Sequence, residues 1–357
     1  TGVGDMGHQA WKEWKRTTEQ YARSYPEHWI ELENRMEKRY PENWEAQLPV
    51  FAADEKGMAT RSASGQVLNA LTNVFPQIVG GSADLTPSNN TWIKNSSAFQ
   101  SDNHGGRYLH FGVREHAMGA IVNGMAYHGG FIPFGATFLV FTDYMRGAIR
   151  LSALSHLQTI WVMTHDSIGL GEDGPTHQPI EQIMNLRQVP NMTVLRPADA
   201  NETLEAWRLA LMNTKGPTTL VFSRQNLKVL DRQVLAPAAG VRQGGYILWE
   251  SSSNPEMILI ATGSEVAMTL DAAYKLAAEN IKVRVVSLPS WEIFDRQPQA
   301  YRDQVLSPSD WADSTVITTQ ARWLMHDWLF YKVAEAYALS ADWDNRWRTG
   351  GAVDEVQ

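Results

Sequence analysis

Short hydrophobic runs alternate along the chain with longer stretches in which apolar residues recur at helical spacing. The runs are "QIVGG", "YLHFG", "IPFG", "TIWVMTH", "TVLRP" and "TTLVFS". Before the first run, Ala63, Val67, Leu68 and Leu71 fall on one face of an expected helix. This alternation predicts a doubly wound, mainly parallel α/β sheet with helices on both faces. We expect this first domain to cover residues 49–230.

Proline and capping residues mark where further helices begin and end. Pro26 and Pro41 divide residues 1–48, a charged segment with many Trp and Tyr residues, into two helical pieces. We interpret this segment as a packed helical linker in front of the first domain. Within the domain, Asp199 and Glu202 have the spacing of a capping box and predict a helix start.

A second, smaller α/β domain is expected over residues 245–357. After a polar connection, a strand "EMILIA", a turn "TGSE", a helix over 266–279 and a strand "KVRVVSLP" form one βαβ unit. The "TGSE" turn could present backbone amides to an anion, but it lacks a full glycine-rich fingerprint. We therefore favour a plain helix start at this turn.

Composition narrows the classes of function. The 357 residues carry a formal net charge of −8 and no long Lys/Arg block, so neither nucleic acid nor an anionic membrane finds a broad basic surface. Cysteine is absent, which excludes disulfides, thiolate metal sites and Cys nucleophiles. The sequence shows neither a signal core nor an apolar run of membrane-spanning length. We expect a cytoplasmic protein with no nucleic-acid or membrane partner.

Polar side chains concentrate where the expected strands end. In chain order they are Ser82, Asp84, Ser88, Glu115, His165, Asp166, Asp173, His177, Ser223 and Arg224. Each residue alone is more simply explained as a helix cap or a surface charge. Ligands of open α/β sheets, however, bind at the carboxyl ends of the strands. The joint placement therefore predicts one polar binding site.

The segment "THDSIGLGEDGPTHQP" is the most informative part of this cluster. Its glycines allow the backbone to bend closely around a small polar molecule. Its two His residues and its Asp residues could also bind a metal ion, but their spacing matches no standard zinc pattern. We expect no metal site formed by this chain.

Three aromatic residues, Phe138, Phe141 and Tyr144, recur at steps of three in "FGATFLVFTDYMRG". On a helix they would share one face. Such a stripe most often belongs to a hydrophobic core. At a strand end, the same stripe would form a flat apolar slot for an aromatic ring, adjoining Glu115.

Four segments, "GGSADLTPSN", "GVREHAMGAI", "THDSIGLGEDGPTHQP" and "LVFSRQN", resemble the pyrimidine-binding domain of transketolases, which are thiamine diphosphate enzymes. The resemblance covers roughly residues 8–306. It implies transfer of a two-carbon ketol unit from a ketose phosphate to an aldose phosphate, with thiamine diphosphate as the cofactor. It also implies that Glu115 is the catalytic partner of the cofactor's pyrimidine nitrogen. The residues that it places around the pyrimidine are Asp84, Phe138, Phe141 and Tyr144.

The resemblance also implies a set of substrate residues. Those matching the ligands of the sugar phosphate are Arg61, Ser88, His165 and Arg224. Arginine forks and short donors suit a small dianion, which agrees with this assignment. Asp173 matches the residue that binds a substrate hydroxyl, and His177 matches a catalytic residue near the reacting carbon.

One part of the family's pattern is missing from this sequence. Transketolases hold the diphosphate and its Mg²⁺ or Ca²⁺ ion on a separate N-terminal domain with a Gly-Asp-Gly motif, and this chain has no such motif. We expect a partner diphosphate-binding half, with this chain as one subunit of a split transketolase or a fragment, in a dimer of such pairs. The alternatives are a related thiamine diphosphate-dependent synthase and a non-catalytic interaction subunit.

The sequence after about residue 306 is atypical, because it lacks the family's Phe-Gly and Ala-Pro ending and is rich in Trp. We hypothesise that it is coding sequence read out of frame. A helix over 321–339 is the alternative.

Overall fold

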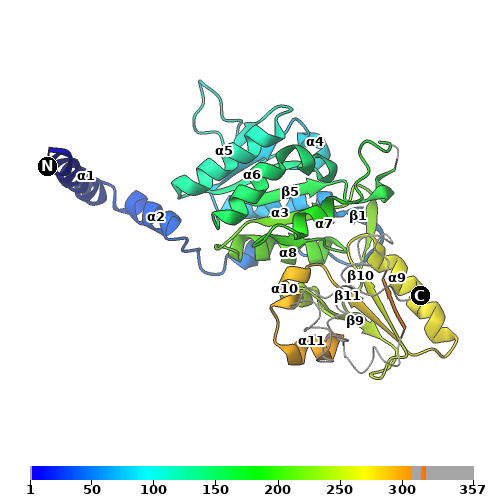
Figure 1. Cartoon of the computed structure of the whole chain (residues 1–357). Coiled ribbons are helices and arrows are strands. Elements are labelled where there is room, and N and C mark those ends of the chain that lie inside the picture. The colour runs from blue at the N-terminus through cyan, green and yellow to red at the C-terminus, as the bar shows by residue number, and fades with distance from the viewer. Residues whose placement is uncertain (1, 172, 307–314, 319–357) are drawn as a thin grey trace, which may run out of the picture.

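The computed structural model describes residues 2–171, 173–306 and 315–318. A projecting helical segment leads into a central α/β domain, below which lies a smaller α/β domain (Figure 1). None of the helices in the described part of the chain combines the length and the apolar character of a membrane span. The atypical tail lies outside the described residues, apart from β12 (Thr315–Thr318), and so does the alternative helix over 321–339.

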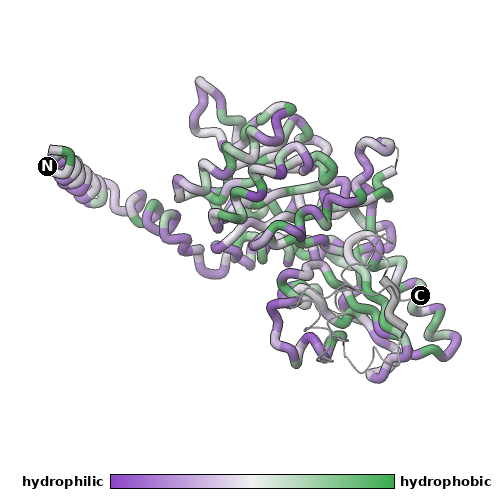
Figure 2. The backbone as a smooth tube through the Cα atoms, viewed as in Figure 1, coloured by the Kyte–Doolittle hydropathy of each residue, from purple (hydrophilic) through white to green (hydrophobic). Residues whose placement is uncertain are grey.

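The N-terminal segment forms α1 (Gly2–Ser24) and α2 (Pro26–Met36), which confirms the two helical pieces. The expectation of a packed linker is wrong for both helices, because neither has a buried residue and both project from the body of the molecule (Figure 1). Packing begins only at η1 (Trp44–Gln47), where the Trp44 ring lies 5.3 Å from the ring of Phe75. The projecting segment is mostly hydrophilic, whereas hydrophobic stretches run through the two domains (Figure 2).

The central domain contains the predicted parallel sheet. Its strands are β2 (Ile78–Ser82), β3 (Tyr108–His110), β4 (Ile132–Phe138), β5 (Ile160–Thr164), β6 (Thr193–Leu195) and β7 (Thr218–Phe222). They lie in the order β3-β2-β4-β5-β7-β6, and every neighbouring pair is parallel. Each predicted hydrophobic run is therefore a strand of one doubly wound sheet.

Helices cover both faces of this sheet. They are α3 (Thr60–Val74), α4 (Thr86–Asn89), α5 (Glu115–His128), α6 (Thr142–Leu154), α7 (Gln182–Arg187) and α8 (Ala200–Met212). Val67 and Leu68 of α3 join Trp207 of α8 in one hydrophobic core, whereas Met118 of α5 and Met145 of α6 join another. Side chains of a strand point alternately to the two faces, which explains why β5 contributes to both cores.

The smaller domain contains the predicted βαβ unit, formed by β10 (Met257–Ala261), α9 (Glu265–Ala278) and β11 (Val283–Ser287). Its sheet has the order β12-β10-β11-β9 and includes an unpredicted antiparallel strand, β9 (Tyr246–Glu250). The remaining elements are η4 (Ala238–Gln243), α10 (Trp291–Asp295) and α11 (Gln299–Val305). A further antiparallel pair, β1 (Asp54–Ala59) with β8 (Asn226–Val229), was also not predicted.

The predicted helix start at Asp199 is present in α8, but the reciprocal bond of the capping box goes to the residue before the N-cap. The Asp199 carboxylate accepts a hydrogen bond from the Glu202 backbone N–H at 2.8 Å, and the Glu202 carboxylate accepts one from the Ala198 N–H at 2.8 Å. Glu202 also accepts hydrogen bonds from the hydroxyls of Tyr246 and Ser287 in the smaller domain. This helix start therefore also joins the two domains.

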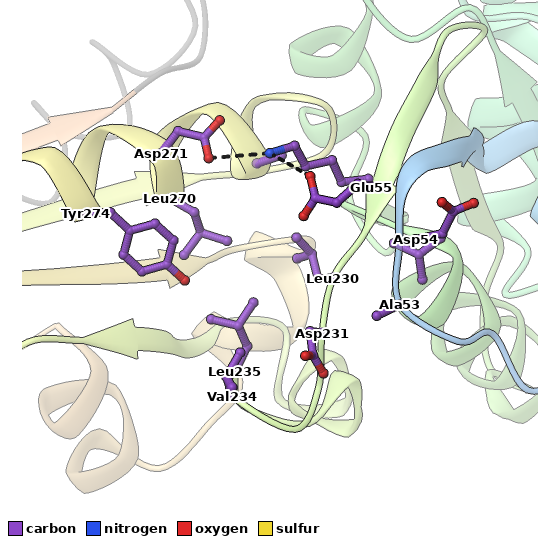
Figure 3. A pocket seen from close by; sticks show the side chains of 13 residues that line it. Ala53, Asp54, Glu55, Leu230, Asp231, Val234, Leu235, Leu270, Asp271 and Tyr274 are labelled. Atoms are coloured by element: carbon purple, nitrogen blue, oxygen red, sulfur yellow. Dashed lines mark ion pairs between the residues drawn. The ribbon is translucent and has the colours of Figure 1, made fainter.

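A cavity of about 430 Å³ lies where β1 and β8 meet α9 of the smaller domain (Figure 3). On its rim, the Lys228 ammonium lies 3.2 Å from a carboxylate oxygen of Glu55 and 3.6 Å from one of Asp271. The residues that line this cavity include none of the predicted site residues. The predicted site residues lie instead at the strand ends of the large sheet.

Candidate functional site

Most of the predicted site residues follow the carboxyl ends of adjacent strands in the large sheet. Phe138 is the last residue of β4, His165 follows β5, and Arg224 comes shortly after β7. Since β4, β5 and β7 are parallel neighbours, the sheet order brings these positions together at the carboxyl-terminal end of the strands. Glu115 belongs to the same end by topology, as it begins the helix that follows β3.

A cluster of basic side chains surrounds Asp173. Its carboxylate lies 3.4 Å from Nε of Arg224 and 3.6 Å from Nε2 of His165. Burial and the positive charge of Arg224 lower the pKa of Arg61, and the nearby charge of Asp173 opposes them. The Arg61 guanidinium donates a 2.8 Å hydrogen bond to the backbone carbonyl of Ser88. The structure thus brings together all five residues that were predicted to contact the polar part of a substrate.

The environment of His165 keeps its imidazole neutral. Burial lowers its pKa to about 4, and the positive charge of Arg61 acts in the same direction while Asp173 opposes both. Its Nδ1 lies 2.9 Å from the hydroxyl oxygen of Thr164. The backbone at His165 is left-handed, with φ of 63°, which is costly for a residue with a Cβ. A strained, neutral imidazole is suited to exchanging hydrogen bonds with a polar ligand.

The three predicted aromatic residues stack, but they do not share one helix. Phe138 ends β4, Phe141 lies in η2 (Leu139–Phe141), and only Tyr144 belongs to α6. The expectation of a single helical stripe is wrong, because the buried strand continues to Phe138 before the chain turns. The rings of Phe138 and Phe141 nevertheless lie 5.6 Å apart at 11°, and those of Phe141 and Tyr144 lie 5.8 Å apart at 29°. They form a flat apolar stack.

Both histidines contact this aromatic stack. The His165 imidazole lies against the Phe138 ring, with 3.6 Å between centroids. The His177 imidazole meets Phe138 and Phe141 edge-on, at 5.9 and 5.4 Å. The apolar wall and the basic cluster are therefore two parts of one continuous site.

Glu115 is the first residue of α5, and it is buried. Within the described residues, no hydrogen bond or ion pair engages its carboxylate. The helix N-terminus favours a negative charge at this position. Small residues let α5 pack closely, since a Cβ added to Gly119 would lie only 2.6 Å from Cβ of Ala148 in α6. The chain therefore holds a buried carboxylate that is available to a ligand.

Two further residues, Asp84 and Asn89, follow the end of β2. Asp84 has a left-handed backbone with φ of 64°, and within the described residues no hydrogen bond or ion pair joins its side chain to the basic cluster. Asn89 was missed by sequence reasoning because it carries no charge. It accepts a 2.6 Å hydrogen bond from Ser82 and donates a 2.7 Å one to Thr164, so it ties the ends of β2 and β5 together. The run of polar residues in "TPSNN" was the signal that could have identified it.

The described residues contain no group of three or more His, Asp or Glu side chains that could hold a metal ion. The "TGSE" turn is occupied by protein: Gly263 packs against the Arg196 side chain, and Arg196 donates hydrogen bonds to Ser264 and Glu265. The side chains of Ser264 and Glu265 are thus engaged by an arginine of the large domain.

Two family models match the chain. The model of the transketolase pyrimidine-binding domain matches residues 56–229, and that of the transketolase-like C-terminal domain matches residues 244–339. The second match extends into the atypical tail.

Similar proteins agree with these matches. The transketolase of Geobacillus stearothermophilus is 50% identical over 308 residues, which are 86% of this chain and 46% of that protein. The transketolase of Aquifex aeolicus is 48% identical over 297 residues, covering 83% of this chain and 43% of that protein. The chain therefore spans less than half the length of these curated relatives.

Solved structures give the same picture. A transketolase from Pichia stipitis in complex with sedoheptulose-7-phosphate superposes with a TM-score of 0.80 at 44% identity, covering 84% of this chain and 45% of that one. A split-gene transketolase, described as an inactive β4 tetramer, superposes with a TM-score of 0.57 at 29% identity, covering 74% of this chain and 79% of that one. The chain belongs to the transketolase family, of which it carries the pyrimidine-binding and C-terminal domains.

Proposed function

We propose that this chain supplies the pyrimidine-binding and C-terminal parts of a transketolase. The complete enzyme transfers a two-carbon ketol unit from a ketose phosphate to an aldose phosphate. The observation that carries the proposal is the continuous site at the strand ends, in which an apolar ring stack meets a cluster of basic side chains. When bound, thiamine diphosphate supplies the carbon nucleophile that takes up the two-carbon unit.

The chain's own residues fit the pyrimidine end of this cofactor. The stack of Phe138, Phe141 and Tyr144 offers a flat apolar wall to an aromatic ring. Glu115 offers a buried carboxylate without a partner among the described residues. A carboxylate in that environment can hold a proton at a ring nitrogen, which is the role we assign to Glu115. Asp84 is assigned to the wall of the same pocket.

The basic cluster fits a sugar phosphate. Arg61 and Arg224 provide planar forks for a dianion, and His165 and Ser88 stand beside them. Complexes of the Pichia stipitis enzyme with sedoheptulose-7-phosphate and, in a variant, xylulose-5-phosphate support this ligand class. Asp173 is assigned to a substrate hydroxyl.

His177 completes the catalytic assignment. Its imidazole lies edge-on to the Phe138 and Phe141 rings, so it stands beside the place proposed for the cofactor. From there it can exchange a proton or a hydrogen bond with the hydroxyl at the reacting carbon. The residue thus links the cofactor wall to the basic cluster.

A partner diphosphate-binding half completes the enzyme in this proposal. That half holds the diphosphate group and most of the coordination sphere of its Mg²⁺ or Ca²⁺ ion, in a cytoplasmic dimer of such pairs. The likeness to a split-gene transketolase supports this division.

The test is complementation. The chain is mixed with the part of the Geobacillus stearothermophilus transketolase that it does not match, together with thiamine diphosphate and Mg²⁺. Ketol transfer from a ketose phosphate to an aldose phosphate is then measured. Transfer by the mixture supports the proposal, whereas a stable complex that binds the cofactor and transfers nothing contradicts it.

A further inference from the structure

Arg196, which directly follows β6, joins the two domains through a buried cluster of polar groups. On one side its guanidinium donates hydrogen bonds of 2.9 and 2.7 Å to the Asp166 carboxylate. On the other side it bonds to the smaller domain, at 3.1 Å to the carbonyl of Thr262, 2.9 Å to Ser264 and 3.0 Å to Glu265. Both Arg196 and Asp166 are almost completely buried. One side chain thus ties the start of α9 to the end of β5.

Asp166 connects this polar cluster to a loop of the candidate site. Asp166 follows His165 and lies in the loop between β5 and α7, which we define as residues 165–171 and 173–181 and call the β5–α7 loop. This loop also carries Asp173 and His177, and it contains Gly169 in its η3 turn (Ile168–Leu170) and Gly171 and Gly174 after it. A glycine-rich segment loses much conformational entropy when it is fixed. External anchors are therefore needed to hold its side chains in place.

The other end of the loop is anchored to the same domain. At the end of α7, the buried Arg187 guanidinium lies over the Trp291 ring, 3.9 Å from its centroid. Nε of Arg187 lies 3.8 Å from Oε1 of Glu292. The other carboxylate oxygen of Glu292, Oε2, accepts a hydrogen bond from the Val194 N–H. Both Trp291 and Glu292 belong to α10 of the smaller domain. The loop is thus held at each end by an arginine that contacts the smaller domain.

We propose that the C-terminal domain positions the β5–α7 loop for substrate binding, with Arg196 and Arg187 as the positioning residues. Neither arginine contacts the candidate site directly; each acts through the loop or helix that it anchors. The effect on substrate rests on the proposed function, but the effect on the loop itself does not. The domains are also joined away from the loop, at Glu202 with Ser287, so they stay docked when one arginine anchor is weakened.

Amide hydrogen–deuterium exchange of the chain, followed by mass spectrometry, tests the anchoring. Arg196→Lys keeps the charge but removes the two-pronged contact, so amides of residues 173–181 should exchange about tenfold faster, the effect of losing one charged hydrogen bond. Glu265→Gln changes only the smaller domain's side of the cluster and should accelerate the same amides about threefold, because a weaker neutral bond remains.

Arg242→Lys is the matched control. Arg242 also donates two hydrogen bonds to one carboxylate, at 2.7 Å to Oε2 and 2.8 Å to Oε1 of Glu205, but this pair does not touch the loop. Its loop exchange should equal that of the parent. Unchanged loop exchange in Arg196→Lys overturns the proposal. Acceleration spread equally over β4 and β7 overturns it as well, because it would show general loosening.

Kinetics with the complementing half separates this proposal from the proposed function. In Arg196→Lys, KM for the aldose phosphate should rise about fivefold and kcat should fall as well, since the loop carries both the substrate residue Asp173 and the catalytic residue His177. A parent enzyme without ketol transfer, together with faster loop exchange in the variant, refutes the function but supports the anchoring. Ketol transfer by the parent, together with unchanged loop exchange in Arg196→Lys, supports the function and refutes the anchoring.

Discussion

At the scale of single residues, the burial of His165 among basic groups has a measurable consequence for stability. Its pKa in the folded chain is about 4, below the ordinary value of 6.5. Between these two pH values the unfolded chain binds a proton that the folded chain does not. The contribution of His165 is therefore fully present above about pH 6.5 and is lost as the pH falls towards 4.

His165→Gln removes this titration while retaining a polar side chain of similar length. We expect the free energy of unfolding of the parent to fall more steeply between pH 6.5 and pH 4 than that of the variant. Urea unfolding at several pH values measures both slopes. His104→Gln, at an exposed loop position, is the control and should follow the parent. Equal slopes for the parent and His165→Gln would show that the imidazole is not held neutral.

Arg224 is assigned to the phosphate group of the substrate. In the complemented enzyme, Arg224→Ala should lower kcat/KM for a phosphorylated acceptor about tenfold to a hundredfold more than for its unphosphorylated analogue, since one charged hydrogen bond is lost. Lys228→Ala, which changes a cation at the distant cavity, should affect neither acceptor. Equal losses for both acceptors in Arg224→Ala would remove this residue from the phosphate site.

Sequence reasoning located most of the candidate site at this scale because strand ends are readable from hydrophobic runs. It identified His165, Asp173 and Arg224 as neighbours, and the structure brings them together. It could not place Phe138 on a strand, because steps of three match a helix equally well. It also missed Asn89, whose role depends on hydrogen bonds between strands that are distant in sequence.

At the scale of elements, the N-cap residue of α8 also binds groups outside its own helix. Asp199 accepts hydrogen bonds from the Glu202 N–H and the Leu230 N–H, and it pairs with Arg232 at 3.0 Å. The Asp199 side chain is completely buried. Its removal therefore leaves buried donors without an acceptor.

We expect Asp199→Ala to lower the free energy of unfolding by about 3 kcal/mol or more, the range for breaking a buried ion pair that also caps a helix. Chemical denaturation measures the change. Asp231→Ala removes an exposed carboxylate from the connection after β8, where among the described residues it accepts a hydrogen bond only from the Gln233 N–H, and should cost about 0.5 kcal/mol or less. Similar costs for the two substitutions would contradict the assigned role of Asp199.

The contrast between buried and exposed positions also explains which elements could be predicted from the sequence. The strands β4, β5, β6 and β7 of the large sheet are buried on both faces and read as hydrophobic runs. The strands β1 and β8 were missed because the Asp54–Ala59 stretch is mostly exposed and polar. Its pairing with the distant Asn226–Val229 stretch is a tertiary effect that local patterns do not encode.

At the scale of the whole molecule, the chain presents surfaces that the two domains do not use. The projecting helices expose Trp11 and Trp14, and α6 exposes Tyr144, Leu151 and Leu154. Exposed large apolar side chains in such numbers are typical of surfaces that bind another protein. They agree with the proposal that this chain works in a larger assembly.

The chain by itself should not transfer ketol units at a measurable rate. The reason is that the chain spans less than half the length of its transketolase relatives and has no Gly-Asp-Gly motif. Coupled assay of a ketose phosphate and an aldose phosphate, with thiamine diphosphate and Mg²⁺ added, measures this. The mixture with the complementing half is the positive control. Turnover by the chain alone at the rate of the mixture would refute the proposed division of the site.

The central claim, that this chain supplies the acid–base group for the cofactor's pyrimidine ring, is tested most directly by Glu115→Gln in the complemented enzyme. The substitution keeps the size of the side chain and removes its charge. We predict that kcat falls about a hundredfold or more, the range for losing a positioned acid–base group, while cofactor affinity changes much less. Glu31→Gln, at an exposed position of α2, should leave kcat unchanged. A Glu115→Gln enzyme with the parent's kcat would contradict the account.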